Sequence, residues 1–150
     1  FCVFKIRFDF ASDASLFLLI IIICILTDIG GFVFGKVFKG PKLIKYSPNK
    51  TYSGLLGSFL LSFTIIPINS YFNFITDATL TTLVIFTFVV SSISQFGDIL
   101  ISYFKRVSKI KDTGNIIPGH GGLLDRIDGM IFAFPISYLL IIFKIIEIVK

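Results

Sequence analysis

Charged residues are scarce in this 150-residue sequence, where Asp, Glu, Lys and Arg together make up 15%. A typical soluble domain carries about 25%. Hydrophobic residues instead reach 55%, and the mean hydropathy is +0.92. The length would suit one soluble domain, but apolar runs of about 20 residues are typical of membrane-spanning helices. The composition argues against an ordinary soluble domain and predicts a single all-α, polytopic membrane domain.

Cysteine and histidine, the usual ligands of zinc, are also few. Cys2 and Cys24 lie far apart and form no CxxC pair, and His120 is the sole histidine in the sequence. A closed structural zinc site needs four such ligands. We therefore expect no zinc site, and we expect both cysteines to be chemically inert.

Several signatures of other function classes are missing. The GxxxxGK[ST] spacing of a P-loop is absent, and no set of Ser, His and Asp supports a hydrolase triad. The basic residues lack the interleaved aromatics of RNA-binding surfaces, so we expect no nucleic-acid partner. Because the chain begins with Phe1 and shows no remnant of a signal peptide, we expect further N-terminal membrane helices to be missing from it.

Four apolar segments are each long enough, or nearly so, to cross a bilayer as a helix. The first contains a single charged residue, Asp28, and the other three contain none. The last segment contains a proline that should kink it. The predicted spans are Ala14–Gly35, Thr51–Thr76, Ala78–Gly97 and Gly129–Phe143.

The basic residues concentrate in two of the connections between these segments. The connection after the first span and the connection after the third each hold five of the 14 Lys and Arg residues. Two crossings separate these loops, so they lie on the same side of the membrane, and the positive-inside rule makes that side the cytoplasm. We therefore expect a multi-pass protein of a bacterial inner membrane, with membrane lipids as partners and its polar loops in the cytoplasm.

Acidic residues at the ends of two spans are candidate metal ligands. Asp98, Ser102 and Lys105 would share one face if the third helix continues past the apolar run. A carboxylate there needs either a partner, such as Lys105, or a metal. Asp125 and Asp128 stand three residues apart, which suits Mg²⁺ with its oxygen ligands but equally suits an acidic first turn of a helix.

Glycine-rich and hydroxyl-rich turns lie near these acids. In PGHGG, Gly121 and Gly122 allow close approach of the backbone to an anion, and His120 could either donate to a phosphate or hold the turn. In SPNKTYSG, Ser47, Lys50 and Thr51 could contact a phosphate, although Ser or Thr at a helix start is often only a cap. Asp28 is a further candidate because ionisable residues inside membranes are usually functional.

The segment from Ser102 to Asp128, SYFKRVSKIKDTGNIIPGHGGLLDRID, resembles the signature of the phosphatidate cytidylyltransferase (CDP-diacylglycerol synthase) family. TDIGG, SPNKTYSG and QFGD further upstream are similar to other elements of that family. The fixed positions of the signature are all present: Ser102, Lys105, Arg106, Lys111, Asp112, Gly114, Pro118, His120, Gly121, Gly122, Asp125, Arg126 and Asp128.

The resemblance implies transfer of CMP from CTP to phosphatidate with Mg²⁺, and it implies roles for individual residues. Asp98 and Asp125 would be the leading metal ligands, with Asp128 in support. A homodimer is a candidate assembly. Phosphates of CTP or phosphatidate would be held by Lys105, Arg106, Lys111 and Arg126. The other substrate-site residues would be Ser47, Lys50, Thr51, Ser102, Asp112, His120, Gly121 and Gly122.

Three other interpretations stay open from the sequence. A CTP-dependent polyprenol or phytol kinase would use an alcohol as its nucleophile and would need a base. A membrane transporter would use Asp28 and Asp98 to line a path and would turn over no CTP. An inactive fragment would lack helices needed to complete the lipid site.

Overall fold

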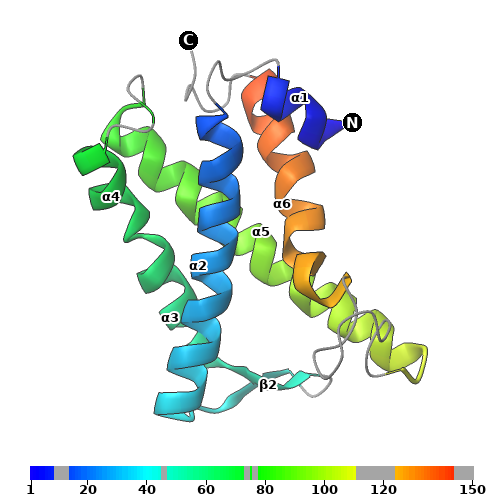
Figure 1. Cartoon of the computed structure of the whole chain (residues 1–150). Coiled ribbons are helices and arrows are strands. Elements are labelled where there is room, and N and C mark those ends of the chain that lie inside the picture. Colours follow the sequence, from blue (N-terminus) through cyan, green and yellow to red (C-terminus); the bar gives the residue numbers. More distant parts are fainter. Residues whose placement is uncertain (9–13, 45–46, 73–74, 76–77, 111–123, 144–150) are drawn as a thin grey trace.

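The computed structural model describes residues 1–8, 14–44, 47–72, 75, 78–110 and 124–143, and for residues 44, 47–49 and 124–126 it describes the backbone only. These residues form a helical bundle with one short hairpin at its end (Figure 1). The predicted all-helical membrane fold is thereby confirmed. The elements are α1 (Cys2–Phe8), α2 (Ser15–Phe38), β1 (Lys42–Ile44), β2 (Ser47–Thr51), α3 (Tyr52–Ser62), α4 (Ile65–Phe72), α5 (Leu80–Val107) and α6 (Leu124–Ile142).

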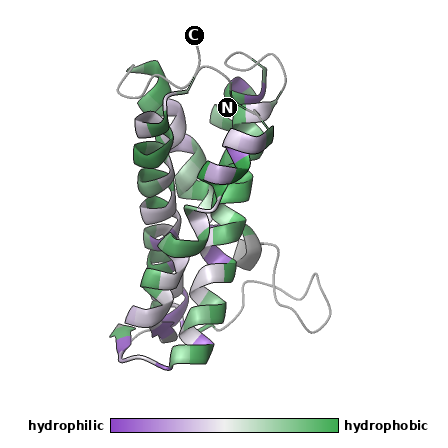
Figure 2. Cartoon of the chain, turned by 90° about the vertical axis from the view of Figure 1, so that its left-hand side faces the viewer, coloured by the Kyte–Doolittle hydropathy of each residue, from purple (hydrophilic) through white to green (hydrophobic). Residues whose placement is uncertain are grey.

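Among the described residues, three helical stretches are long and apolar enough to cross a membrane: α2, the combined α3–α4 stretch Tyr52–Phe72, and α5. The fourth predicted span corresponds to a shorter apolar helix, Ile127–Ile142 within α6. Hydrophobic residues run along most of the bundle, and hydrophilic residues gather at the end that carries the hairpin (Figure 2). The hydrophobic pattern therefore located all four elements, although the last is shorter than the others.

The second span is divided because of a proline. Pro67 lies in the first turn of α4, where a proline is tolerated. In the interior of one continuous helix its ring would clash with the carbonyl of the residue four positions earlier. That earlier residue is Phe63, and the chain forms a turn at Phe63 and Thr64. Thr64 Oγ1 donates to the carbonyl oxygen of Leu61 at 2.6 Å, which satisfies one of the carbonyls freed by the break.

Glycines bring α2 and α3 into close contact. A Cβ on Gly30 would lie 2.5 Å from the carbonyl oxygen of Gly57, and a Cβ on Gly54 would lie 2.7 Å from the carbonyl oxygen of Gly31. Small residues allow such close approach of helix backbones inside a membrane, where association depends on packing and hydrogen bonds because lipid chains are as apolar as the helices. The glycines thus determine how α3, and the hairpin that leads into it, sit against α2.

Buried hydroxyl groups connect the same helices to α5. Thr27 Oγ1 on α2 donates to Ser91 Oγ on α5 at 2.9 Å, and Ser58 Oγ on α3 donates to the carbonyl oxygen of Thr27 at 2.8 Å. Gln95 on α5 donates to Ser91 Oγ from one turn further along. Hydrogen bonds between membrane helices contribute about 0.6 kcal/mol each on average, so their main effect here is to define which faces meet.

The hairpin was not predicted from the sequence. β1 and β2 pair antiparallel, with Lys42 opposite Thr51 and Ile44 opposite Ser47. Thr51 ends β2 and caps α3, because its Oγ1 accepts from the backbone N–H of Gly54 at 3.1 Å. The hairpin therefore delivers the residue before the cap, Lys50, to the end of the helical bundle.

The glycine contact makes a prediction about stability. Gly30→Ala should destabilise the protein by about 1–3 kcal/mol, the usual cost of overpacking, because the new Cβ would meet the backbone of Gly57. Thermal unfolding in detergent, followed by the loss of the monodisperse peak in size-exclusion chromatography, measures this. Val33→Ala, at an exposed position on the same helix, is the control and should cost much less. Equal stability of Gly30→Ala and the unsubstituted protein would contradict the close α2–α3 packing.

Candidate functional site

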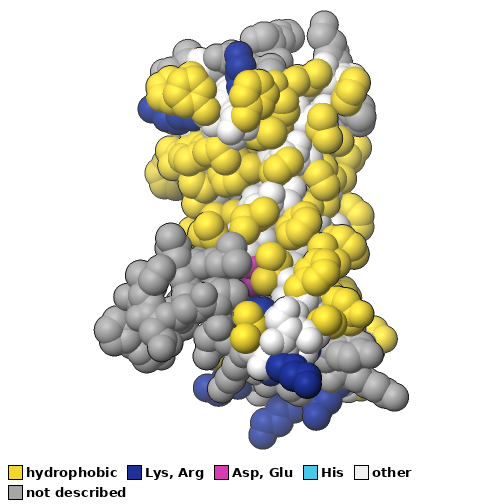
Figure 3. Space-filling model, turned by 90° about the vertical axis from the view of Figure 1, so that its right-hand side faces the viewer, with side chains coloured by type: hydrophobic (Ala, Val, Ile, Leu, Met, Phe, Trp, Pro, Cys, Tyr) yellow, Lys and Arg dark blue, Asp and Glu magenta, His cyan; other side chains and the backbone are white. Residues whose placement is uncertain are grey.

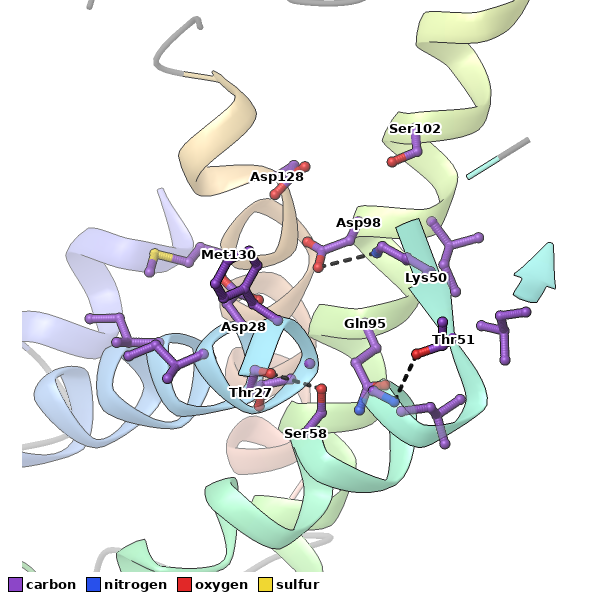
Figure 4. Close-up of a pocket in the computed structure, with 18 residues that line it drawn as sticks. Thr27, Asp28, Lys50, Thr51, Ser58, Gln95, Asp98, Ser102, Asp128 and Met130 are labelled. Carbon is purple, nitrogen blue, oxygen red and sulfur yellow. Dashed lines mark hydrogen bonds and ion pairs between the residues drawn. The ribbon is translucent and has the colours of Figure 1, made fainter. Parts of the chain in front are cut away.

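A cavity of about 520 Å³ lies at the hairpin end of the bundle, bordered by α2, both strands of the hairpin, α3, α5 and α6. Figure 4 shows polar side chains from α2, β2, α3, α5 and α6 around this cavity. Four separate regions of sequence therefore contribute to one site. Its polar lining consists of Thr27, Asp28, Lys50, Thr51, Ser58, Gln95, Asp98, Ser102 and Asp128.

An ion pair joins the hairpin to α5 inside this cavity. Lys50 Nζ lies 3.3 Å from Asp98 Oδ2, and the two side chains are 28% and 18% exposed. Sequence spacing had offered Lys105 as a partner for Asp98, whereas the structure places Lys50 there (Figure 4). A largely buried carboxylate at the end of a membrane helix is costly without such a partner, so Lys50 stabilises the ionised form of Asp98.

Two glycines bring the carboxyl groups of Asp98 and Asp128 together. A Cβ on Gly129 would lie 2.8 Å from Asp98 Oδ1, and a Cβ on Gly97 would lie 3.2 Å from the carbonyl oxygen of Asp128. α5 and α6 can approach this closely only because both positions lack a side chain. As a result, Asp98 and Asp128 are near enough to interact directly, and both face the cavity (Figure 4).

The side chains that line the cavity suit a magnesium ion that is shared with substrate phosphates. They do not suit a metal held by protein ligands alone. Among the residues that the structure describes, no three His, Cys, Asp or Glu side chains converge as a metal cage. Mg²⁺, however, is usually held by one or two carboxylates together with substrate phosphates and water. Asp98 and Asp128 supply two carboxylates, and Asp98 Oδ1 is buried without a hydrogen-bond partner. This oxygen is suited to a ligand that the protein itself does not provide.

Other lining residues have narrower roles in the structure. Thr51 is the N-cap of α3, so the structural interpretation of this residue is confirmed. Ser102 lies one turn beyond Asp98 on the same face of α5, and both line the cavity, as helical spacing predicted. Asp28 lies in an unbroken part of α2 and borders the cavity from the side opposite Lys50 (Figure 4).

The remaining predicted site residues do not line this cavity or fall outside the described side chains. Lys105 and Arg106 occupy the last turn of α5, beyond Ser102. The backbones of Ser47, Asp125 and Arg126 are described, but their side chains are not. Asp125 and Arg126 lie in the first turn of α6, which begins at Leu124. Five further residues, Lys111, Asp112, His120, Gly121 and Gly122, lie outside the described residues.

Sequence reasoning missed several residues that line the cavity, among them Gln95, Ser58 and Met130. Gln95 precedes Asp98 by three residues, and this helical spacing alone could have placed both on one face. Ser58 and Met130 carried no such signal, because each reaches the cavity through contacts between helices that are distant in sequence.

The cavity opens towards the face of the bundle shown in Figure 3. Acidic surface is visible there between hydrophobic side chains above and Lys and Arg side chains below. The acidic side chains that the structure describes are Asp28, Asp98 and Asp128, and all three line the cavity. The site is therefore accessible at the level where the hydrophobic surface gives way to the basic end of the molecule.

The chain is similar in sequence to known proteins. The chain is 40% identical to a phosphatidate cytidylyltransferase of Staphylococcus haemolyticus over 118 residues, and 40% identical to one of Rickettsia conorii over 140 residues. These alignments cover 78% and 88% of this chain but only 45% and 61% of the two relatives, so the chain spans about half the length of the proteins it matches.

A model of the cytidylyltransferase family matches residues 1–143. This range includes every element of the bundle and all the residues that line the cavity. The chain belongs to the cytidylyltransferase family.

Proposed function

We propose that this protein transfers the cytidylyl group of CTP to phosphatidate, giving CDP-diacylglycerol and pyrophosphate. The observation that carries the proposal is the convergence of Lys50, Asp98 and Asp128 in a cavity open at the boundary between the hydrophobic surface and the basic end. Such a position suits a reaction between a lipid phosphate and a water-soluble nucleotide. The relatives named phosphatidate cytidylyltransferase support the choice of both substrates.

The chemistry of this reaction matches the groups in the cavity. An oxygen of the lipid phosphate attacks the α-phosphorus of CTP, a new P–O bond forms, and the bond to pyrophosphate breaks. The second pKa of a phosphate monoester is about 6, so the nucleophile is already ionised near neutral pH and needs no strong base. The obstacles are repulsion between two anions and the charge that develops on the leaving pyrophosphate, and positive charge at the site lowers both.

Particular residues would meet these requirements. Asp98 and Asp128 would hold Mg²⁺, with Asp125 as a further ligand, and the ion would neutralise phosphate charge when bound. Lys50 would orient the carboxylate of Asp98 and present positive charge to a phosphate. Lys105 and Arg106, one turn beyond Ser102, would attract the nucleotide to the mouth of the cavity.

The location of the basic residues supports an orientation in the membrane. The hairpin, the end of α2 and the end of α5 lie at one end of the bundle (Figure 1). Lys36, Lys39, Lys42 and Lys105 belong to these elements. By the positive-inside rule this end faces the cytoplasm, and the membrane would be the inner membrane of a bacterium. CTP would then reach the cavity from the cytoplasm, and phosphatidate would reach it from the bilayer.

Asp98→Asn tests the metal assignment. The substitution keeps the shape of the side chain but removes its charge, so turnover should fall by at least about 10²-fold, the usual effect of losing one electrostatic contributor. The Mg²⁺ concentration needed for half-maximal turnover should rise. Formation of labelled CDP-lipid from CTP and phosphatidate measures both values. Normal turnover with an unchanged magnesium requirement would contradict this role of Asp98.

Lys50→Met tests the positive charge in the cavity. Turnover should fall by about 10²-fold, and the KM for CTP or phosphatidate should rise, because the phosphates lose a cation and Asp98 loses its partner. Lys42→Met is the matched control, since Lys42 is exposed on the same hairpin and does not line the cavity. An equal loss of activity in both variants would indicate a general effect of charge on the hairpin.

The same assay separates the other interpretations when it includes a second lipid acceptor. A protein that phosphorylates a polyprenol with CTP and makes no CDP-lipid would be a lipid kinase. A protein that uses no CTP with either acceptor would not be a CTP-dependent enzyme, and a transporter would then be the better interpretation. The assay uses the full-length protein.

A further inference from the structure

A second cavity, of about 380 Å³, runs along the surface of α6. It is lined by Ile127, Met130, Ile131, Phe134 and Pro135 of α6 and by residues 1–3. Every residue that lines this groove is apolar. A polar ligand would lose its hydrogen bonds to water there without replacement, so the groove suits a hydrocarbon chain.

Helix geometry gives the groove a direction. Ile127, Met130, Ile131 and Phe134 are spaced i, i+3, i+4 and i+7, and such residues form one stripe along a helix. The stripe covers about 10 Å, or roughly a third of the hydrocarbon core of a bilayer. Because α6 begins at the basic end and runs away from it (Figure 1), the groove extends from the level of Asp128 into the hydrophobic part of the molecule.

The groove adjoins the polar cavity. Met130 lines both of them, so one side chain forms a shared wall. Asp128, which faces the polar cavity, lies between Ile127 and Met130 in the sequence of α6. A molecule with a phosphate beside Asp128 and a hydrocarbon chain in the groove would therefore contact adjacent faces of one helix.

We propose that this groove holds an acyl chain of the lipid substrate whose phosphate occupies the polar cavity, an assignment that rests on the function proposed above. One end of the substrate needs cations and the other needs an apolar surface, and two cavities that both border Met130 offer both. Anchoring the chain beside the site would orient the phosphate for attack and contribute binding energy remote from the reacting atoms.

Photolabelling tests the occupant directly. A phosphatidate with a diazirine in its acyl chain should label α6 between Ile127 and Phe134, and excess unlabelled phosphatidate should suppress that labelling. A phosphatidylcholine with the same diazirine is the control for bulk lipid. Equal labelling of α6 by both lipids, or labelling that phosphatidate does not suppress, would overturn the proposal. Absence of any label on α6 would also overturn it and would indicate that protein fills the groove.

A substitution that fills the groove provides a kinetic test. Ile131 is 41% exposed, and Ile131→Trp places a larger side chain in the groove. The KM for long-chain phosphatidate should rise about tenfold, because the free-energy cost of overpacking by one side chain corresponds to a change in affinity of that size. The KM for CTP and turnover of a short-chain phosphatidate should stay unchanged. Leu139→Trp is the matched control, because Leu139 is 47% exposed on the same helix and does not line the groove.

The outcomes distinguish the groove from the reaction itself. If the unsubstituted protein makes CDP-lipid and both Trp variants have the same KM for long-chain phosphatidate, the groove assignment is wrong and the proposed function stands. If the unsubstituted protein makes no CDP-lipid, the proposed function is wrong, and the groove assignment that rests on it is wrong as well. Photolabelling of the unsubstituted protein gives an answer even if Ile131→Trp does not fold.

Discussion

The pairing of Lys50 with Asp98 is the interaction on which the site depends. Asp98 lies near the end of a long apolar helix, where an ionised carboxylate is unfavourable unless a cation is close to it. Lys50 comes from a hairpin far away in the sequence and reaches Asp98 at 3.3 Å. For this to happen, α3 must pack against α2, the hairpin must end at the N-cap Thr51, and α5 must pass beside both. One polar contact therefore requires a particular arrangement of three helices.

Glycine provides the close approaches that make this arrangement possible. On one side of the bundle, Gly30 and Gly57 let the backbones of α2 and α3 meet. On the other, Gly97 and Gly129 let α5 and α6 meet, which brings the carboxyl groups of Asp98 and Asp128 together. Lipid does not drive helices together as water does, so shape and hydrogen bonding must hold the bundle. The same contacts that stabilise the bundle thus also form the polar cavity.

α6 borders the two chemical environments that the proposed function would require. Asp128 faces a cavity that contains an ion pair, whereas Ile131 and Phe134 face an apolar groove, and Met130 borders both. A phosphate and its hydrocarbon chain differ in their solvation by many kcal/mol, so a site for both must separate them sharply. Adjacent faces of a single helix achieve this separation over a few residues.

The sequence alone determined the features that depend on local patterns. Apolar runs predicted the helices, and helical spacing placed Asp98 and Ser102 on one face. These predictions succeed because burial in lipid and the period of a helix act over short stretches of chain. Only the tertiary structure decided that Lys50 is the partner of Asp98, that a hairpin precedes α3, and that Met130 joins two cavities. Those features depend on how closely helices distant in sequence can approach, and that distance is determined by the packing of their side chains.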